Sequence, residues 1–251
     1  MSTARSIPRR EPPPFRSVTV AGKEAVSPRM IRVFMTGDSL EGFSIEAPAA
    51  SVRLLLPRAD HLEIPTWRGN EFLLADDTRP TIRTLTPRRF DHDRRVLDLD
   101  IALHEEGVLT PWAQGCRPGD PAAVSGPGRG YAIDPTAGRF VLLGDESAIP
   151  AICQLLEWLP DVPISTHIGI ASQNAMVDLH RDVDERWSVV PSVDALGDEL
   201  VESITDIVID EGTHVWAAGE AAAMHRLRGH LFDERGVQRS AASVRGYWKA
   251  R

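Results

Sequence analysis

The pattern of apolar residues changes near Gly138, and this change limits the folds open to the chain more than any other feature. Before it, short β-like runs are separated by turns, with few helical patterns between them. In the run V-L-D-L-D-I-A-L, apolar and acidic residues alternate, which predicts that Asp98 and Asp100 face water. The first half of the chain therefore predicts an antiparallel Greek-key β-barrel. The runs that carry this prediction are residues 15–20, 30–35, 51–56, 82–86 and 96–103.

After Gly138 the chain alternates between strand and helix patterns. The continuous apolar run R-F-V-L-L-G predicts a strand covered on both faces, and apolar residues then recur at helical spacing up to Leu159. Asp194 is expected to cap a helix that ends at about Thr205. This alternation predicts a parallel-sheet, nucleotide-binding α/β domain. Further strands are expected at residues 164–170, 187–190 and 213–217, and a further helix at 223–231.

A length of 251 residues is enough for two ordinary domains. Four prolines lie within the first 14 residues, which is typical of a disordered tail. The predicted organisation is a tail at residues 1–14, a barrel at 15–135 and an α/β domain at 136–251.

The composition excludes several function classes. A net charge of -8 argues against nucleic-acid binding, because phosphate contact needs a basic face. The two cysteines, Cys116 and Cys153, are too few for a disulfide framework and are expected to be small buried residues. The eight histidines do not cluster at metal-ligand spacing, so no metal site is predicted. No apolar run approaches the roughly 18 residues of a membrane span, and none follows the pair Arg9-Arg10, so a cytoplasmic protein is predicted.

Arg83, Leu85 and Thr86 end one predicted barrel strand. The guanidinium fork of an arginine at this place suits a diphosphate, because it meets phosphate oxygens in a bidentate way. The hydroxyl of Thr86, three residues later, could reach the edge of a flavin ring. The alternative is an ordinary charged strand end.

Thr110 and Pro111 form a helix-start signal, an N-cap hydroxyl followed by proline at the first helical position. The free N–H groups of a helix start attract anions, so a pyrophosphate could lie there. The alternatives are a capped helix that binds nothing and a structural, hydrogen-bonded His104. The glycine-rich run from Gly126 to Gly130 precedes no helix, so it is interpreted as the linker between the domains.

Two predicted parallel strands end in a glycine and an acid. Gly144, Asp145 and Glu146 follow the first, and Gly219 and Glu220 follow another. The carboxyl ends of parallel strands share one edge of the sheet, so both turns are expected to line one crevice. The alternative is tight-turn chemistry alone.

The order of these motifs resembles one known family. R-T-L-T-P-R is followed by L-H, W-A, R-P-G-D, G-P, L-L-G-D-E-S-A-I-P-A-I, W-A-A-G-E and finally R-G-Y-W-K. Together they resemble the siderophore-interacting proteins, the FAD-dependent ferric-siderophore reductases of the ferredoxin–NADP reductase superfamily. The resemblance extends over about residues 15–250.

The resemblance implies a set of cofactor contacts and no side chain that acts as a catalyst, since the flavin carries the chemistry. It implies Arg83 near the FAD phosphates, Leu85 and Thr86 near the isoalloxazine, and the backbone from Ala102 to His104 at the ring edge. The turn before Trp112, with Thr110, would hold the pyrophosphate. NADH or NADPH would lie against the two glycine-acid turns, at Gly144, Asp145, Glu146, Gly219 and Glu220.

The resemblance also implies a substrate, a ferric siderophore that is reduced so that Fe(II) is released. Family members attract anionic ferric chelates with basic residues, and the matching positions here are Arg53, Arg129 and Lys249. Such a pocket on an acidic protein would steer the chelate electrostatically.

The sequence departs from the family pattern at the flavin. Leu85 stands where an aromatic residue is usual, and Glu105 and Glu106 stand where a glycine and a small polar residue are usual. These departures leave open that the same fold is used for another flavin-assisted or non-redox reaction in secondary metabolism. A further alternative is a non-catalytic ferric-chelate binding protein, with Arg53, Arg129 and Lys249 as its contacts. Ser172 to Asn174 follow a predicted strand without an arginine, which favours NADH slightly.

Overall fold

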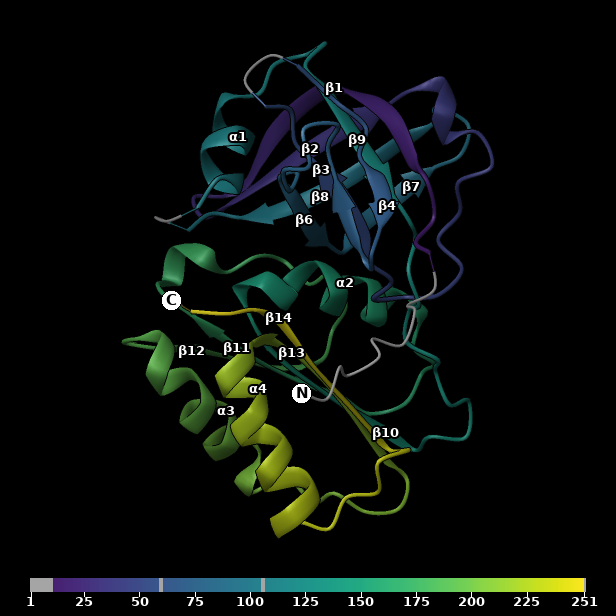
Figure 1. Cartoon of the computed structure of the whole chain (residues 1–251). Helices are drawn as coiled ribbons and strands as arrows, with labels where there is room; N and C mark the ends of the chain where they lie inside the picture. The colour runs from purple at the N-terminus through teal and green to yellow at the C-terminus, as the bar shows by residue number, and fades with distance from the viewer. Residues whose placement is uncertain (1–10, 59–60, 105–106, 251) are drawn as a thin grey trace, which may run out of the picture.

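Two β-sheets built on different plans divide the chain (Figure 1). The computed structural model describes residues 11–58, 61–104 and 107–250. The N-terminal half forms an antiparallel sheet of seven strands, and the C-terminal half forms a parallel sheet of five. The predicted fold class, a β-barrel followed by an α/β domain, is confirmed. The predicted tail at residues 1–14 lies mostly outside the described residues.

The seven-stranded sheet curls into a barrel because its two edge strands are adjacent in the sequence. Its order is β6-β3-β9-β1-β2-β8-β7, and only Thr86 separates β6 from β7. A flat sheet would hold these edges several strands apart, about 4.8 Å per strand, so one connecting residue requires a closed curve. The strands are β1 (Phe15–Ser27), β2 (Met30–Thr36), β3 (Val52–Leu55), β6 (Ile82–Leu85), β7 (Pro87–Asp91), β8 (Val96–Ala102) and β9 (Pro121–Ser125).

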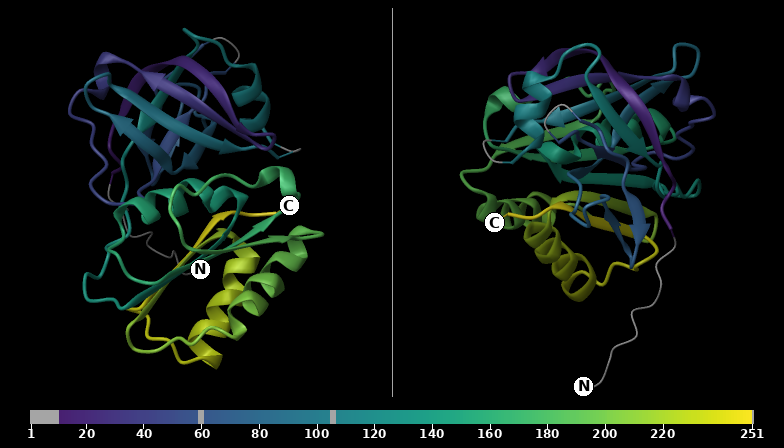
Figure 2. Two further views of the ribbon diagram at one scale, coloured as in Figure 1. Left: turned by 180° about the vertical axis from the view of Figure 1, so that it is seen from behind. Right: turned by 45° about the horizontal axis from the view of Figure 1, so that its top comes forward.

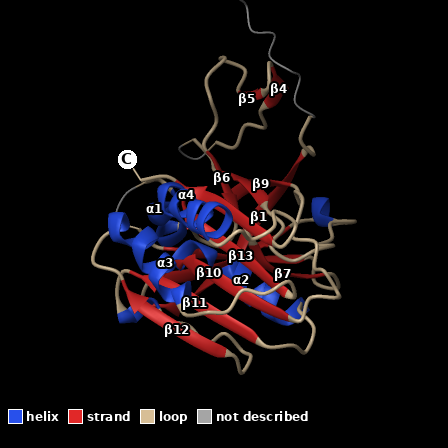
Figure 3. Ribbon diagram, turned by 90° about the horizontal axis from the view of Figure 1, so that it is seen from below, coloured by secondary structure: helices blue, strands red, loops and turns tan. Residues whose placement is uncertain are grey.

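Two smaller pieces complete the barrel half. The hairpin of β4 (Thr66–Arg68) and β5 (Glu71–Leu73) stands away from both sheets (Figure 3). The short helix α1 (Leu109–Gly115) connects β8 to β9. Its buried Ala113 and partly buried Trp112 pack on the barrel core, so α1 closes one end of the barrel.

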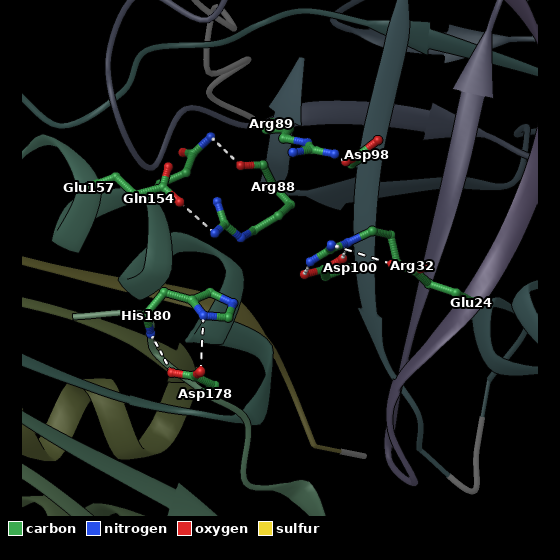
Figure 4. Close-up of polar contacts among 10 residues, drawn as sticks. All are labelled: Glu24, Arg32, Arg88, Arg89, Asp98, Asp100, Gln154, Glu157, Asp178 and His180. Carbon is green, nitrogen blue, oxygen red and sulfur yellow. Dashed lines mark hydrogen bonds and ion pairs between the residues drawn. The ribbon is translucent and has the colours of Figure 1, made fainter. Parts of the chain in front are cut away.

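The alternation on β8 was interpreted correctly for one face and wrongly for the other. Leu97, Leu99 and Ile101 are buried in the barrel core, as predicted. The prediction that Asp98 and Asp100 face water is wrong, since they are 2% and 6% exposed. Arginines of the two neighbouring strands, Arg32 on β2 and Arg89 on β7, pair with these carboxylates (Figure 4).

The parallel sheet has the order β12-β11-β10-β13-β14, and every pairing in it is parallel. Helix α2 (Ile149–Trp158) covers the face turned to the barrel, while α3 (Leu196–Thr205) and α4 (Ala221–Arg228) cover the other face (Figures 1 and 2). A π-helical turn, Gly229–Glu234, extends α4. The strands are β10 (Arg139–Asp145), β11 (Ile164–Ile170), β12 (Asp184–Val189), β13 (Thr213–Glu220) and β14 (Ala242–Trp248).

Alternate residues of the central strand β10 serve the two faces. Phe140 and Leu142 pack with α2, whereas Val141 and Leu143 pack with α3 and α4. All four are fully buried, which explains the unbroken apolar run in the sequence. The core under α2 also takes in Met30 from the barrel, so the two halves share one continuous apolar cluster.

Two predicted helix starts are corrected. Asp194 does not cap α3, because the Ser192 side chain accepts from the Ala195 N–H and begins a 3₁₀ turn that leads into the helix. Thr110 is not the N-cap of α1, since the helix begins at Leu109. Strand β14 was not predicted at all.

Cys116 and Cys153 are free and buried, as predicted. Burial raises the pKa of the Cys153 thiol to about 11. Within the described ranges, no helix has the length and apolarity needed to cross a bilayer. The same ranges contain no group of three His, Cys, Asp or Glu side chains placed to bind a metal ion.

His167 on β11 predicts an acid-sensitive fold. The residue is 2% exposed, and among the described residues neither ring nitrogen has a hydrogen-bond partner. Burial, with the charges of Arg186 and Arg139, lowers its pKa from 6.5 to about 4. Between these two pKa values, His167 binds a proton in the unfolded chain but not in the folded chain. The contribution of His167 to the free energy of unfolding, present above pH 6.5, is therefore lost as the pH falls toward 4.

We expect the free energy of unfolding to fall by about 2 kcal/mol between pH 7 and pH 5 because of this residue alone. Urea unfolding of the wild type and His167→Leu at both pH values measures the difference, which the variant should lose. His225→Leu is the control, since His225 is exposed on α4. An equal pH dependence in wild type and His167→Leu would show that His167 does not titrate in this way.

Candidate functional site

A cavity of about 790 Å³ lies between the barrel and the parallel sheet. Its barrel wall consists of β6, the end of β8 and the start of α1, and its other wall includes the end of β14. The volume falls within the roughly 300–1,000 Å³ of typical ligand pockets. The lining residues include Arg83, Leu85, Thr86, Asp100, Ala102, His104, Thr110, Ser147, Pro150, Tyr247, Trp248 and Lys249.

The structure brings together most of the predicted barrel contacts. Six of the predicted cofactor contacts on the barrel line this cavity, although they come from three separate segments. Strands β6 and β8 lie at different places in the sheet, and the curl of the barrel turns both toward the same space. The six are Arg83, Leu85, Thr86, Ala102, His104 and Thr110.

Thr86 joins the two halves across the cavity. It is 5% exposed, and its hydroxyl donates to the Tyr247 hydroxyl oxygen at 3.4 Å. Burial raises the pKa of Tyr247 despite this bond, so the phenol stays protonated at neutral pH. The ring of Tyr247 also makes an edge contact with Trp216, with centroids 6.3 Å apart and an interplanar angle of 80°.

His104 and Trp248 form an aromatic contact where the halves meet. Their ring centroids lie 5.5 Å apart at an interplanar angle of 31°. The backbone N–H of His104 donates to Thr110 Oγ1 at 2.9 Å, so the threonine hydroxyl holds the loop before α1 rather than capping the helix. The indole Nε1 of Trp248 donates to Asp145 at 2.8 Å. His104 is therefore held through its backbone, and Trp248 through the edge of its indole ring.

A second cavity of about 170 Å³ adjoins the first. It lies at the carboxyl ends of β10, β11 and β12, and it includes Asp145, Glu146 and Gly169. His104 and Trp248 line both cavities. In open parallel sheets, ligands bind at this edge, beyond the carboxyl ends of the strands.

Glu146 ties the second cavity to the barrel. Its carboxylate is 5% exposed and accepts from Arg29 Nε at 3.1 Å and from the Ala171 N–H at 2.7 Å. Arg29 lies in the turn between β1 and β2, so this buried ion pair links the barrel to the ends of β10 and β11.

Asp145 is fully enclosed by donors. Its oxygens accept from Ser147 N and Oγ, from the Glu220 N–H at 2.8 Å and from Trp248. Burial raises the pKa of the carboxyl group, against the opposing effect of these bonds. Asp145 therefore joins the ends of β10, β13 and β14 at the edge of the second cavity.

Four predicted cofactor residues line neither cavity. A Cβ at Gly144 would lie 2.5 Å from Ala148 Cβ, and one at Gly219 would lie 2.6 Å from Asp145 Oδ2, so both glycines permit close packing. Glu220 caps α4 by accepting from the N–H groups of Ala222 and Ala223. Trp112 packs against the barrel core. Their roles in binding stay predictions.

Of the three predicted basic residues, only Lys249 is among the lining residues of the cavity. Arg53 pairs on β3 with Thr84, which also lines it. Arg129 is exposed, and the preceding Gly128 donates its N–H to Ser51, which brings this part of the linker beside the start of β3. Within the described part of the chain, no ion pair involves these three residues or Arg83.

The site contains residues that the sequence did not indicate. Tyr247 and Trp248 were quoted in the ending R-G-Y-W-K but not assigned to the site, although the resemblance of this ending was the signal that could have found them. Asp100 also lines the cavity, although the sequence pattern assigned it to the face of its strand that is turned to water. Glu105 and Glu106, the departures from the family pattern beside the predicted pyrophosphate turn, lie outside the described residues.

The residues present fit FAD. The cavity combines the basic side chains of Arg83 and Lys249, which form no ion pair among the described residues, with the apolar surface of Leu85 and Ala102 and a buried carboxylate at Asp100. The basic side chains suit a diphosphate, and the apolar surface suits a flat aromatic ring. The carboxylate can accept a hydrogen bond from an N–H group of such a ring.

Comparisons with known proteins agree with this fit. Residues 19–131 match the model of the siderophore-interacting FAD-binding domain, and residues 137–251 match the model of the siderophore-interacting protein. An uncharacterized protein of Mycobacterium tuberculosis is 35% identical over 94% of this chain and 90% of its own length. The NADPH-dependent ferric-chelate reductase of Escherichia coli is 31% identical over 62% of this chain and 61% of its own length.

Solved structures give the same result. A siderophore utilization protein from T. fusca has a TM-score of 0.81 and 31% identity, covering 95% of each chain. The siderophore-interacting protein SipS from Aeromonas hydrophila has a TM-score of 0.79 and 28% identity, covering 94% of this chain and 92% of that one. The ferredoxin–NADP⁺ reductase of Plasmodium falciparum shares the fold, with a TM-score of 0.65 at 10% identity.

The predicted enzyme class, an FAD-dependent oxidoreductase, is supported by the FAD-binding domain, the reductase fold and the ferric-chelate reductase relative. Both family matches together extend over nearly the whole described chain. The chain belongs to the siderophore-interacting protein family.

Proposed function

We propose that the protein is an NAD(P)H-dependent reductase that passes electrons through FAD to a ferric siderophore and releases Fe(II). The observation that carries this proposal is the meeting of the two cavities at His104 and Trp248. A flavin in the larger cavity and a nicotinamide in the smaller one would then lie against each other. A reductase needs this adjacency, because hydride transfer requires near contact of the reacting atoms.

The barrel residues would hold FAD by charge and shape. Arg83 would bind the diphosphate in a bidentate way, and the backbone near Thr110 would approach its other oxygens. Leu85 and Ala102 would cover the ring, and the hydroxyl of Thr86, oriented by Tyr247, would face the ring edge. When bound, FAD converts a two-electron donor into a source of single electrons.

The smaller cavity would take the nicotinamide. It lies at the carboxyl ends of parallel strands, and Asp145 and Glu146 hold its walls in place through buried hydrogen bonds. The E. coli relative is named as NADPH-dependent, which supports NADPH, whereas Ser172 to Asn174 provide no arginine for a 2′-phosphate.

The substrate would be an anionic ferric chelate drawn to Arg53, Arg129 and Lys249. Lys249 lines the cavity and Arg53 pairs with Thr84 of its wall, so on a protein whose net charge is -8 these charges would form a local attractive field. One NAD(P)H supplies two electrons and so reduces two Fe(III) to two Fe(II), with release of NAD(P)⁺ and one proton. Oxygen ligands hold Fe(II) less firmly than Fe(III), so reduction loosens the chelate.

We further propose domain boundaries of 15–135 and 136–251, and a cytoplasmic location, where the nicotinamide donor is available.

The purified protein, loaded with FAD under anaerobic conditions, tests the function. We expect NADH or NADPH to bleach the flavin absorption, and a ferric siderophore to restore it with about two Fe(II) per nucleotide, trapped by a chromogenic Fe(II) chelator. A parallel titration with each nucleotide decides between the donors. Chelate binding without reoxidation would reject the proposal in favour of a binding protein, and a protein that takes up no flavin would reject it outright.

A further inference from the structure

Two aspartates on one face of β8 differ in their access to the large cavity. Asp98 and Asp100 are both buried, and each is held by an arginine of a neighbouring strand, Asp98 by Arg89 at 2.8 Å and Asp100 by Arg32 at 2.6 Å (Figure 4). Only Asp100 lines the large cavity. Of two similar buried ion pairs, one therefore faces the place where a ligand would lie.

The carboxylate of Asp100 is held in a two-point ion pair with Arg32. Arg32 donates to both of its oxygens, through Nε at 2.6 Å and Nη2 at 2.9 Å. The hydrogen bond with Asp100 is the largest influence that raises the pKa of Arg32. Glu24 lies 3.6 Å from the same guanidinium. A bidentate pair of this kind leaves the side chain little freedom to rotate.

The carboxylate still has unused acceptor capacity. Two carboxylate oxygens offer about four lone-pair sites, and Arg32 occupies two. Among the described residues, the hydrogen bonds of Asp100 are those from Arg32. The rest of its acceptor capacity is therefore available to a donor inside the cavity, and an acceptor placed there would be repelled.

The position of Asp100 points to the ring end of the ligand. It lies two residues before Ala102 on the same face of β8, and it shares the cavity wall with Leu85 and Thr86. The basic side chains suited to phosphates, Arg83 and Lys249, also line this cavity. Oxidised isoalloxazine has a single N–H donor, the imide at N3, while N1, N5 and both carbonyl oxygens only accept.

We infer that Asp100 binds the imide N–H of the flavin ring and thereby fixes which edge of the ring enters the cavity. The inference rests on the proposed function, because it presumes that the ligand is a flavin. Arg32 is then a positioning residue, since it orients the carboxylate without touching the ring. Asp98 has no part in binding.

Flavin titrations of the full chain test this. The probes are FAD and FAD methylated at N3, and the readout is the dissociation constant from quenching of flavin fluorescence. We expect the wild type to bind the methylated flavin about 10- to 100-fold more weakly, as for loss of a hydrogen bond to a charged group. Asp100→Leu should bind FAD about as weakly and should no longer distinguish the two flavins.

Asp98→Leu is the matched control, because it removes the equivalent buried carboxylate outside the cavity. It should keep the wild-type preference. Equal affinity of the wild type for both flavins would overturn the inference and leave the reductase proposal standing, even if Asp100→Leu did not fold. Failure of the wild type to bind either flavin would instead reject the proposed function.

Discussion

Asp145→Ala should destabilise the protein by about 4 kcal/mol, because removal of a buried acceptor leaves each former donor unpaired at a cost of roughly 1–3 kcal/mol. The carboxylate accepts two bonds from Ser147 and one each from the Glu220 N–H and the Trp248 indole. The last two come from β13 and β14, so the loss also separates three strand ends. Urea unfolding at pH 7 measures the effect.

Asp134→Ala is the control for the local part of this effect. Asp134 accepts from the N–H and hydroxyl of Thr136 in the same pattern that Asp145 uses with Ser147, but its side chain is 42% exposed. We expect a loss of about 1 kcal/mol or less there. Similar losses for both variants would show that the bonds from β13 and β14 contribute little.

Gly144→Ala should also be strongly destabilising, by about 3 kcal/mol, although it adds one methyl group. The new Cβ would lie 2.5 Å from Ala148 Cβ and 2.7 Å from the Ala218 carbonyl oxygen. The Ala218 carbonyl belongs to the backbone of the paired strand β13, and Ala148 is the N-cap of α2. Neither neighbour can therefore move freely. Thermal unfolding is the measurement.

Gly138→Ala is the matched control at the start of the same strand. Its added Cβ would meet only the Gly212 carbonyl oxygen, at 3.8 Å, which is an ordinary contact. The midpoint temperature should change little. If Gly144→Ala were as stable as Gly138→Ala but bound less nicotinamide nucleotide, Gly144 would act on the ligand rather than on packing.

The fold was predictable because its apolar periods differ between the halves. The continuous apolar run over β10 indicates a strand buried on both faces, and the alternation over β8 indicates a strand with one face in the apolar core. Periodicity does not say what covers the second face. Asp98 and Asp100 were therefore assigned to water, although both are buried and paired with Arg89 and Arg32.

The candidate site was predictable where a motif lies on one segment, as at Arg83 to Thr86. It was less predictable where the site depends on pairing. Strand β14 contains a glycine and has two basic residues in or beside it, so its sequence lacks a clear strand pattern. It forms a strand by pairing with β13, and Tyr247 and Trp248 could therefore not be placed from the local sequence. The role of Thr110 could not be predicted locally either, because its hydroxyl accepts a hydrogen bond from the His104 N–H and does not cap the helix.

The central claim is that a flavin lies in the cavity between the barrel and the parallel sheet, and a crystal structure of the protein with FAD tests it most directly. We predict the diphosphate beside Arg83, and the ring between Leu85 and the end of β14 with its imide toward Asp100. FAD bound elsewhere on the chain, or this cavity closed by side chains in the complex, would contradict the claim.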